Sequence, residues 1–388
     1  MTQRLYYTDS RLRTFEASIV DRSDEGRRVY LDRTAFYPTA GGQPCDTGRL
    51  SGVAVTEVVE EGDRIAHLVA DPIKGDLVEG EVNWARRFDH MQQHSGQHLL
   101  SAVLADLLGH TTVGVHIGQD NSTLDLAAEQ LTAEQISRVE DRANEIVTEN
   151  RPVEISFEEA EDATGLRKAS DRVGALRIIT IENLDRSACG GTHVRSTGEI
   201  GSILIRKLER MRKGMRLEFL GGLRAVRRTR TEAEVLSRLA SEYSASITDL
   251  PHLAASQRAE LKQAGTARRQ LEAALSHYRA RELYGTTAPN PAGLRKALVR
   301  EPSGTLEELR GLAQAFASLP GAVFVGAVEK PPAVLLSASA DSGMDAGRVL
   351  KGVLSAVGGR GGGSTALAQG TLSDRTQLER VIASLIGA

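Results

Sequence analysis

Three histidines stand four residues apart in the segment HMQQHSGQH, at His90, His94 and His98. Residues four apart lie on one face of an α-helix, so imidazoles on neighbouring turns can hold one metal ion. Four residues exceed a full turn by about 40°, so all three rings cannot bind one ion with equal ease. We therefore expect a helix, beginning near Asp89 and ending at Gly109, that carries two metal ligands and one spare histidine.

A second candidate segment, DRSACGGTHV, lies far downstream and sets Cys189 and His193 four residues apart. The two glycines between them allow the backbone to turn tightly. A thiolate together with imidazoles is a donor set that zinc prefers, with iron and copper as alternatives. We expect one zinc ion per chain, held jointly by the helix and this turn.

Each segment alone also has an ordinary structural explanation. Histidine repeats often lie on helix surfaces, and a lone cysteine usually packs as a small hydrophobic residue. Together, however, the two segments contain one of the two cysteines and four of the nine histidines in the chain. Such a low cysteine content excludes a disulfide scaffold and leaves Cys189 available as a thiolate ligand.

The chain is 388 residues long, which exceeds one compact core and indicates two to four domains. Its 40% hydrophobic and 26% charged residues are an ordinary globular composition. No stretch approaches the roughly 20 uninterrupted apolar residues of a membrane span, and the polar start MTQRLYYTDSRLR lacks a secretory apolar region. We therefore expect a cytoplasmic protein with no membrane partner.

Turn signals and hydrophobic periodicity predict an α+β multidomain protein in four parts. Residues 1–88 read as a small β-rich N-terminal domain, and residues 89–225 as an α+β zinc-binding domain. Residues 226–285 are charged and helical, with Pro251 dividing them, which predicts a helical hairpin or coiled-coil connector. Residues 286–388 alternate helical patterns with apolar strands and predict a C-terminal α/β domain.

Within the second part, strand-like segments near Thr112 to Leu126 precede a second helix from about Thr132 to Asn150. Pro152 then introduces the strand-like segment VEISFEE. This mixture of helices and strands indicates an α+β layer around the metal candidates.

The sequence around these candidates resembles a known family. HSGQHLL from His94, CGGTHV from Cys189 and TGEIG from Thr197 are similar to the editing domain shared by alanyl-tRNA synthetases and the AlaX proteins. The editing domain of threonyl-tRNA synthetases is a more distant relative with similar HxxxH and CxxxH pairs. The resemblance leaves His90 outside the coordinating set. The implied zinc ligands are His94, His98, Cys189 and His193.

The resemblance extends over nearly the whole chain. LDRTAFYPTAGGQPCDTG, from Leu31 to Gly48, resembles the glycine-rich motif of these proteins, with Ala40 where the family usually has a third glycine. GGRGGGSTALAQG, from Gly358 to Gly370, resembles the C-terminal domain of alanyl-tRNA synthetases. The layout is similar to that of the long form of AlaX. No aminoacylation module precedes the editing segment, so the resemblance implies a free-standing editing protein.

The resemblance implies an aminoacyl-tRNA hydrolase that clears mischarged tRNA(Ala), with Ser-tRNA(Ala) as the first candidate substrate and Gly-tRNA(Ala) as the second. Two alternatives stay open: a deacylase with another amino-acid specificity, and a tRNA-binding protein with a structural zinc. Three ligands would leave an open catalytic position on zinc, whereas four would close the site and give zinc an ordering role. We hypothesise that His193 is the most weakly held ligand.

An enzyme that removes serine while sparing alanine needs a polar side chain to sense the extra hydroxyl. The resemblance places Thr112 at this position, although strand propensity explains the residue equally well. Asp185 and Thr192 flank the CxxxH turn and either orient the ligands or cap the turn. Further pocket candidates are Gln97, His116, Gly41, Gly42 and Gln43.

Local charge indicates where RNA would bind, although the net charge is −3. The segment from Arg206 to Arg230 is rich in Arg and Lys and has only Glu209 and Glu218 as acidic residues. We expect its strands to present one charged face to tRNA phosphates, with an ordinary solvated face as the alternative. The tRNA-binding candidates are Arg206, Lys207, Arg210, Arg212, Lys213 and, in the C-terminal glycine run, Arg360.

The helical connector carries a heptad-like series that ends near Tyr278. Its members are Leu261, Ala264, Arg268, Leu271, Leu275 and Tyr278. This spacing predicts a homodimer through the helical and C-terminal regions, and Arg268 at a seam position argues against it.

Overall fold

The computed structural model describes residues 1–171 and 173–387. The chain divides into two compact units, Met1–Glu242 and Tyr243–Ala388. Several separate sheets and helices confirm the prediction of a multidomain α+β protein in its general form. No helix among these residues is long and apolar enough to span a membrane.

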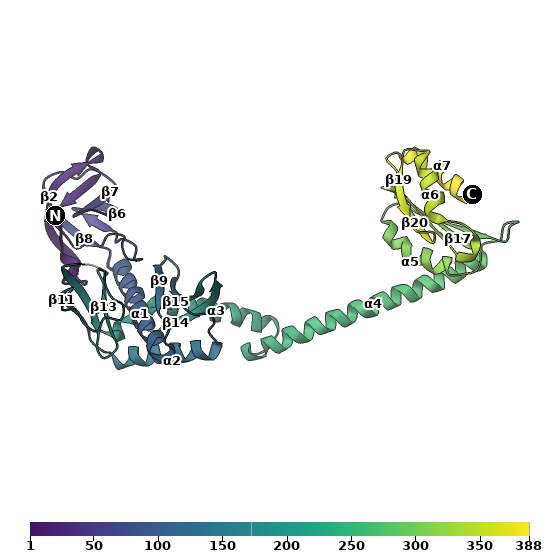
Figure 1. Ribbon diagram of the computed structural model, residues 1–388. Coiled ribbons are helices and arrows are strands. Elements are labelled where there is room, and N and C mark those ends of the chain that lie inside the picture. The colour runs from purple at the N-terminus through teal and green to yellow at the C-terminus, as the bar shows by residue number, and fades with distance from the viewer. Residues whose placement is uncertain (172, 388) are drawn as a thin grey trace. The chain divides into compact units, whose positions relative to one another are not determined.

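The first unit begins with a closed antiparallel barrel (Figure 1). Around the barrel the strands follow the order β2 (Thr14–Ser23), β3 (Arg28–Leu31), β7 (Arg64–Val69), β6 (Val53–Glu61), β5 (Gly48–Leu50) and β8 (Leu77–Val82). Alternation of apolar and polar residues sets which side chains face inward: in β8, Val78 and Val82 are buried while Glu79 and Glu81 are exposed. A short parallel pair is formed by β1 (Gln3–Arg4), which precedes β2 in the sequence, and β4 (Arg33–Thr34), which follows β3.

Helix α1 (Trp84–Leu108) follows the barrel and begins before the predicted start near Asp89. The Asn83 side chain caps it by accepting a hydrogen bond from the Arg86 amide at 3.2 Å, a start signal that the helical periodicity alone did not reveal. The helix ends where predicted, because Gly109 adopts the left-handed conformation with φ of 69°.

Around α1 lie two sheets and a second helix, and together they enclose one hydrophobic core. The four-stranded sheet has the order β14 (Ile203–Met211), β15 (Gly214–Gly221), β10 (Ser122–Leu126) and β9 (Thr112–Ile117). The three-stranded sheet has the order β11 (Val153–Glu159), β12 (Ala175–Ile181) and β13 (Asp185–Ala188). Figure 1 shows α1 running beside α2 (Ala133–Glu149) and strands β9 and β15.

The unit closes with helix α3 (Gly222–Glu242). The basic segment from Arg206 to Arg230 was expected to consist of strands, and this is wrong for its last part, which belongs to α3. Gly222 adopts a φ of 57°, which turns the chain away from strand β15 and into helix α3. The basic residues are therefore divided between a β-hairpin and a helix.

The second unit contains the long helix α4 (Leu250–Thr286) and a five-stranded sheet. Pro251 lies in the first turn of α4, where proline is tolerated, so the helical region is divided just before it, between the end of α3 at Glu242 and the start of α4. The sheet order is β16 (Arg295–Glu301), β17 (Ala322–Glu329), β18 (Pro332–Ala338), β20 (Leu367–Thr371) and β19 (Arg360–Gly363). Helices α5 (Leu306–Ala317), α6 (Ala346–Ser355) and α7 (Leu378–Gly387) complete the unit, and the glycine run forms the edge strand β19.

Candidate metal centre

The two segments singled out in the sequence meet in space. His94 and His98 project from α1, and Cys189 and His193 lie on the turn after β13. One ligand atom from each of the four lies within 4.8 Å of all the others. The three imidazoles are buried and Cys189 is partly buried, so the cluster forms a nearly enclosed cage of one sulfur and three nitrogens.

A glycine makes the close approach between helix and turn possible. A β-carbon added to Gly191 would lie 2.1 Å from His94 Cε1 and 2.4 Å from His94 Nδ1, distances that no side chain can adopt. The CGGTH sequence therefore needs glycine at this position to bring the turn against the helix.

Each histidine of the cluster is fixed through its Nδ1 atom. His94 Nδ1 lies 2.7 Å from Gln43 Oε1, and His98 Nδ1 lies 3.1 Å from Asp185 Oδ2. Amide and carboxylate oxygens only accept, so both rings donate through Nδ1 and direct Nε2 toward the cluster. Hydrogen bonding of one ring nitrogen by an outer partner is the usual arrangement for histidines that bind metals.

The third ring follows the same pattern. His193 Nδ1 lies 3.1 Å from Ser95 Oγ, and the same hydroxyl accepts a hydrogen bond from the Val194 amide. The Nε2 atoms of His94 and His193 both lie 3.4 Å from Cys189 Sγ. Ser95 was not identified from the sequence; its place inside HSGQH, beside a ligand, was the only available signal.

Gln43, predicted as a pocket residue, instead bridges the glycine-rich motif and the cluster. Gln43 Oε1 accepts from His94 Nδ1 and from the Thr192 amide, the latter at 3.3 Å, and Gln43 Nε2 donates to Thr192 Oγ1 at 2.9 Å. Thr192 and Asp185 were named as candidates to orient the ligands. Thr192 bonds to Gln43, which contacts the ring of His94, and Asp185 contacts the ring of His98 directly.

Electrostatics favours a thiolate in this cluster. Burial raises the pKa of the Cys189 thiol, but the neighbouring rings of His94 and His193 outweigh burial and hold that pKa well below its usual value. Burial, followed by the charge of His94, lowers the pKa of His193 to about 3 and keeps that ring neutral. A thiolate and a neutral imidazole are the forms that bind a metal.

The pKa of His98 is raised, in contrast to that of His193. Burial lowers its pKa, but hydrogen bonds to Asp185 and Cys189 prevail and raise the pKa to about 9. Burial would raise the pKa of Asp185, whereas His98 and Arg167 together lower it. Arg167 Nε lies 2.7 Å from Asp185 Oδ1 and so fixes this carboxylate from its other side.

A small cavity of about 250 Å³ adjoins the cluster. It is lined by His94 and Cys189, by both glycine segments through Gly41 and Gly191, and by aromatic side chains that include Tyr37. The candidate metal centre therefore has one side open to a ligand of limited size.

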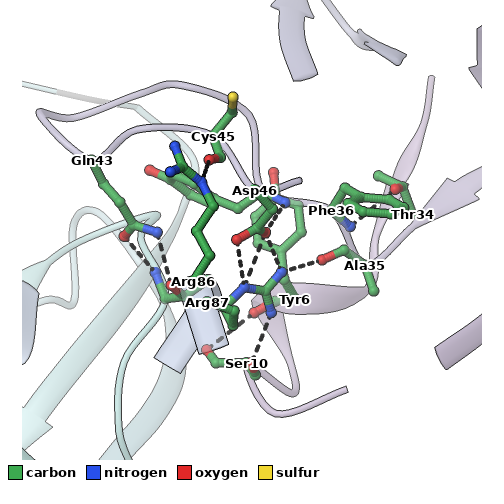
Figure 2. A network of polar contacts seen from close by, with 12 residues as sticks. Tyr6, Ser10, Thr34, Ala35, Phe36, Gln43, Cys45, Asp46, Arg86 and Arg87 are labelled. Atoms are coloured by element: carbon green, nitrogen blue, oxygen red, sulfur yellow. Dashed lines mark hydrogen bonds and ion pairs between the residues drawn. The ribbon is translucent and has the colours of Figure 1, made fainter. Parts of the chain in front are cut away.

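A buried ion pair holds the glycine-rich motif against α1 (Figure 2). Arg87 and Asp46 are fully buried, and Arg87 Nε lies 3.1 Å and 3.0 Å from the two carboxylate oxygens. The remaining guanidinium donors reach the carbonyls of Ser10 at 2.8 Å and Ala35 at 2.5 Å. The Tyr37 amide donates to the same carboxylate at 2.6 Å.

Comparison with known proteins decides which family carries this geometry. The model of the Threonyl and Alanyl tRNA synthetase second additional domain matches residues 176–217, which include the CGGTH turn. The alanyl-tRNA editing protein AlaX-M of Methanosarcina acetivorans is 38% identical over 56% of this chain and 97% of its own length. The chain belongs to this family of alanyl-tRNA editing proteins.

Two further likenesses accompany the AlaX-M match. The alanine–tRNA ligase of Pyrococcus abyssi is 32% identical over 99% of this chain, and the chain spans 43% of the length of that ligase. A crystal structure of the C-Ala domain from Aquifex aeolicus alanyl-tRNA synthetase matches 24% of this chain and 91% of that chain, with 23% identity and a TM-score of 0.20.

The remaining predicted pocket residues of this AlaX relative lie on α1, on β9 and in the glycine-rich motif. Thr112 Oγ1 donates to Ser101 Oγ at 2.8 Å, and Gln97 Nε2 donates to the same hydroxyl at 3.0 Å. His116 is exposed on β9. The carbonyl of Gly42 accepts from the Ile117 amide at 2.9 Å, so the motif is hydrogen-bonded to the end of β9. Gly41 lines the cavity beside Cys189.

His90 lies outside the cluster, as the resemblance implied. It is buried, and its Nδ1 atom has no hydrogen-bond partner among the residues that the structure describes. Burial lowers its pKa to about 4, so the ring is neutral at physiological pH.

Removing the Gln43 side chain should weaken metal binding without unfolding the protein. In Gln43→Ala, the buried Nδ1–H of His94 loses its acceptor, and loss of an outer hydrogen-bond partner typically costs about 10- to 100-fold in metal affinity. Zinc affinity measured by competition with a chromogenic chelator checks this. Gln43→Glu keeps an acceptor for His94 and should retain most of the affinity; equal affinities for Gln43→Ala and the native protein would contradict the assigned role.

Proposed function

We propose that this chain hydrolyses the aminoacyl ester of mischarged tRNA(Ala), with Ser-tRNA(Ala) as the principal substrate and Gly-tRNA(Ala) as the second. One observation carries the proposal. Three imidazoles, each fixed through Nδ1, meet a cysteine thiolate beside a cavity, in a member of the alanyl-tRNA editing family. The names of its AlaX relatives describe alanyl-tRNA editing proteins.

We propose zinc as the resident metal, because one cysteine sulfur and three imidazole nitrogens match its preferred donors. The proposed ligands are Cys189 Sγ and the Nε2 atoms of His94, His98 and His193. Bound zinc supplies a Lewis acid that polarises an ester carbonyl or lowers the pKa of water. We further propose that His193 is the ligand that exchanges with substrate or water. A neutral hydroxyl, that of Ser95, holds its ring, whereas the charged carboxylate of Asp185 holds the ring of His98 more firmly.

The chain's own residues would position the substrate. The cavity beside Cys189 lies between both glycine segments, so backbone amides near Gly41 and Gly191 can approach the ester closely. Its volume of about 250 Å³ suits a small aminoacyl group rather than a whole nucleotide. Buried walls around the cluster limit the entry of bulk water, which strengthens polar interactions inside.

We propose that Thr112 senses the serine hydroxyl. Its own hydroxyl belongs to a short chain of neutral polar groups, Thr112–Ser101–Gln97, on β9 and α1. Such a chain can exchange a hydrogen bond with the extra hydroxyl of serine, which an apolar wall cannot do. Alanine offers no partner there and would gain nothing from it.

Phosphate contacts are proposed for the basic hairpin formed by β14 and β15. Arg210, Arg212 and Lys213 are exposed at its tip and have no ion-pair partner within the described part of the chain. Arg206 and Lys207 instead pair with Glu232 and Glu209, which compensates part of their charge. The first three are therefore the stronger candidates for tRNA phosphates.

Four further predictions belong to this proposal. A cytoplasmic location follows from a tRNA substrate. The division at residues 88, 225 and 285 into barrel, editing, connector and C-terminal domains is proposed as the functional layout. A homodimer through α4 and the C-terminal unit is supported by the exposed apolar residues Leu261, Leu271 and Leu275, and Arg360 is proposed to contact RNA from the edge strand β19.

The proposal is tested by deacylation of tRNA(Ala) charged separately with serine, glycine or alanine. We expect hydrolysis of the seryl ester to exceed that of the alanyl ester by at least about tenfold, because a site that hydrogen-bonds a substrate hydroxyl discriminates strongly against an analogue that lacks it. Threonyl-tRNA(Thr) serves as the comparison for another specificity, and its preferred hydrolysis would contradict the assignment. A protein that protects all these esters would be a binding protein and not an enzyme.

A further inference from the structure

A second and larger cavity lies beside the first turns of α1. It has a volume of about 890 Å³, within the range of ordinary ligand pockets, and it shares no lining residue with the cavity at Cys189. Its walls come from the start of α1, the segment after β9 and one face of α3. Four of the lining residues are Arg86, Arg224, Arg227 and Arg228.

The charge of this cavity is positive and only partly compensated. Arg224 forms a bidentate pair with Asp89, with the closest contact at 2.6 Å, so these two charges cancel. The Arg86 side chain bonds only to a backbone carbonyl, that of Cys45, at 2.9 Å. Arg227 is exposed and has no acidic partner among the residues described. Arg228 pairs with Glu232 at 2.9 Å. The guanidinium groups of Arg86 and Arg227 therefore face one remaining carboxylate of the lining, Asp120, which favours an anionic ligand.

One wall of the same cavity is flat and apolar. The rings of Trp84 and Phe88 stack with centroids 5.3 Å apart and an interplanar angle of 27°. Arg13 covers Trp84 at 4.2 Å from the ring centroid, so the open surface comes from the partly exposed Phe88 and from Leu223, which is 54% exposed. An aromatic surface beside arginines is the combination that binds unpaired nucleotides, with the base on the ring and the phosphate on the guanidinium.

Two buried polar atoms at the floor of the cavity lack partners. His90 is 2% exposed and Gln92 is 5% exposed, and neither His90 Nδ1 nor Gln92 Oε1 has a hydrogen-bond partner within the described residues. Gln92 Nε2 already donates to the carbonyl of Glu199 at 3.0 Å, so the free atom is an acceptor. A neutral imidazole and an amide oxygen can both pair with the edge of a base, and leaving them unpaired costs stability.

We propose that this cavity binds an unpaired nucleotide of the RNA substrate, with its phosphate near Arg227 and its base against Phe88. The position fits such a role, because His90 and the ligand His94 lie one turn apart on α1, a rise of about 6 Å. A nucleotide held there would guide the end of the RNA toward the metal centre. The proposal rests on tRNA being the substrate.

The chain contains a single tryptophan, Trp84, and this residue lines the cavity, so a ligand bound there should change its emission. The probes are two RNA hairpins with the acceptor-stem sequence of tRNA(Ala), one with its unpaired 3′ end and one with that end removed. We expect only the first to change Trp84 emission and to bind more tightly, by about 5- to 150-fold, the range for one stacked base. Equal binding of both hairpins, or binding without a change in emission, would overturn the proposal.

Charge reversal of Arg227 supplies the second readout, with Arg230 as the matched control on the same helix but outside the cavity lining. Arg227→Glu should weaken hairpin binding at least about tenfold and make the slope of log affinity against log salt shallower by about 1, while Arg230→Glu changes it far less. Equal effects of both variants would contradict the site. Because the hairpins carry no amino acid, their binding is measured apart from ester hydrolysis. A native protein that deacylates Ser-tRNA(Ala) but shows none of these differences would refute the cavity alone.

Discussion

Replacing Cys189 with alanine should remove zinc from the protein and reduce deacylation to background. Structural zinc sites bind with apparent free energies of about 10–16 kcal/mol, so an even share for each of four ligands is about 2.5–4 kcal/mol. That share corresponds to a loss of roughly 100- to 1000-fold in affinity. The buried rings of His94 and His193 would also lose the thiolate 3.4 Å away that stabilises them.

The measurements are metal content after dialysis, zinc affinity by chelator competition, and the rate of seryl ester hydrolysis. Cys45→Ala is the matched control, because it removes the only other thiol, which lies outside the four-residue cluster. The control should bind zinc and hydrolyse the ester like the native protein. A Cys189→Ala protein that hydrolyses Ser-tRNA(Ala) at the native rate would exclude the cluster as the reaction centre, whatever its zinc content.

Much of the local structure could be predicted because its signals are contained in short segments. Helix α2 was expected from about Thr132 to Asn150 and spans Ala133–Glu149, since Thr132 and Gln135 form a capping box and Asn150 adopts the left-handed conformation. The spacing of the histidines and of Cys189 and His193 likewise indicated which segments had to meet.

The supporting contacts of the site could not be predicted in this way. Ser95 and Gln43 have no periodicity or motif that assigns them to His193 and His94. These contacts depend on the register between the barrel loop, α1 and the turn after β13, which is set by tertiary packing. The division of the basic segment between a hairpin and α3 was missed because Gly222 changes the chain direction within an otherwise continuous charge pattern.

The buried pair Arg87–Asp46 is the clearest of these long-range contacts, since its residues are 41 apart and both are fully buried. A buried ion pair adds little stability compared with a well-packed apolar pair, because desolvation offsets the attraction. Removing one partner has a different effect, because the other charge stays buried without compensation. The pair therefore fixes where the glycine-rich motif lies, and with it Gln43 and the ring of His94.

Arg87→Met should accordingly destabilise the first unit by about 3–5 kcal/mol, because methionine keeps the apolar stem and leaves the Asp46 carboxylate unpaired. Urea unfolding, followed by the emission of the single tryptophan, measures this loss. Arg142→Met, which removes a partly exposed arginine paired with the surface residues Glu145 and Glu149, is the matched control and should leave the midpoint nearly unchanged. Zinc affinity should fall in Arg87→Met even under conditions where the protein is folded, since the loop that carries Gln43 loses its attachment. Unchanged stability and zinc affinity in this variant would show that the motif is held in place by the barrel alone.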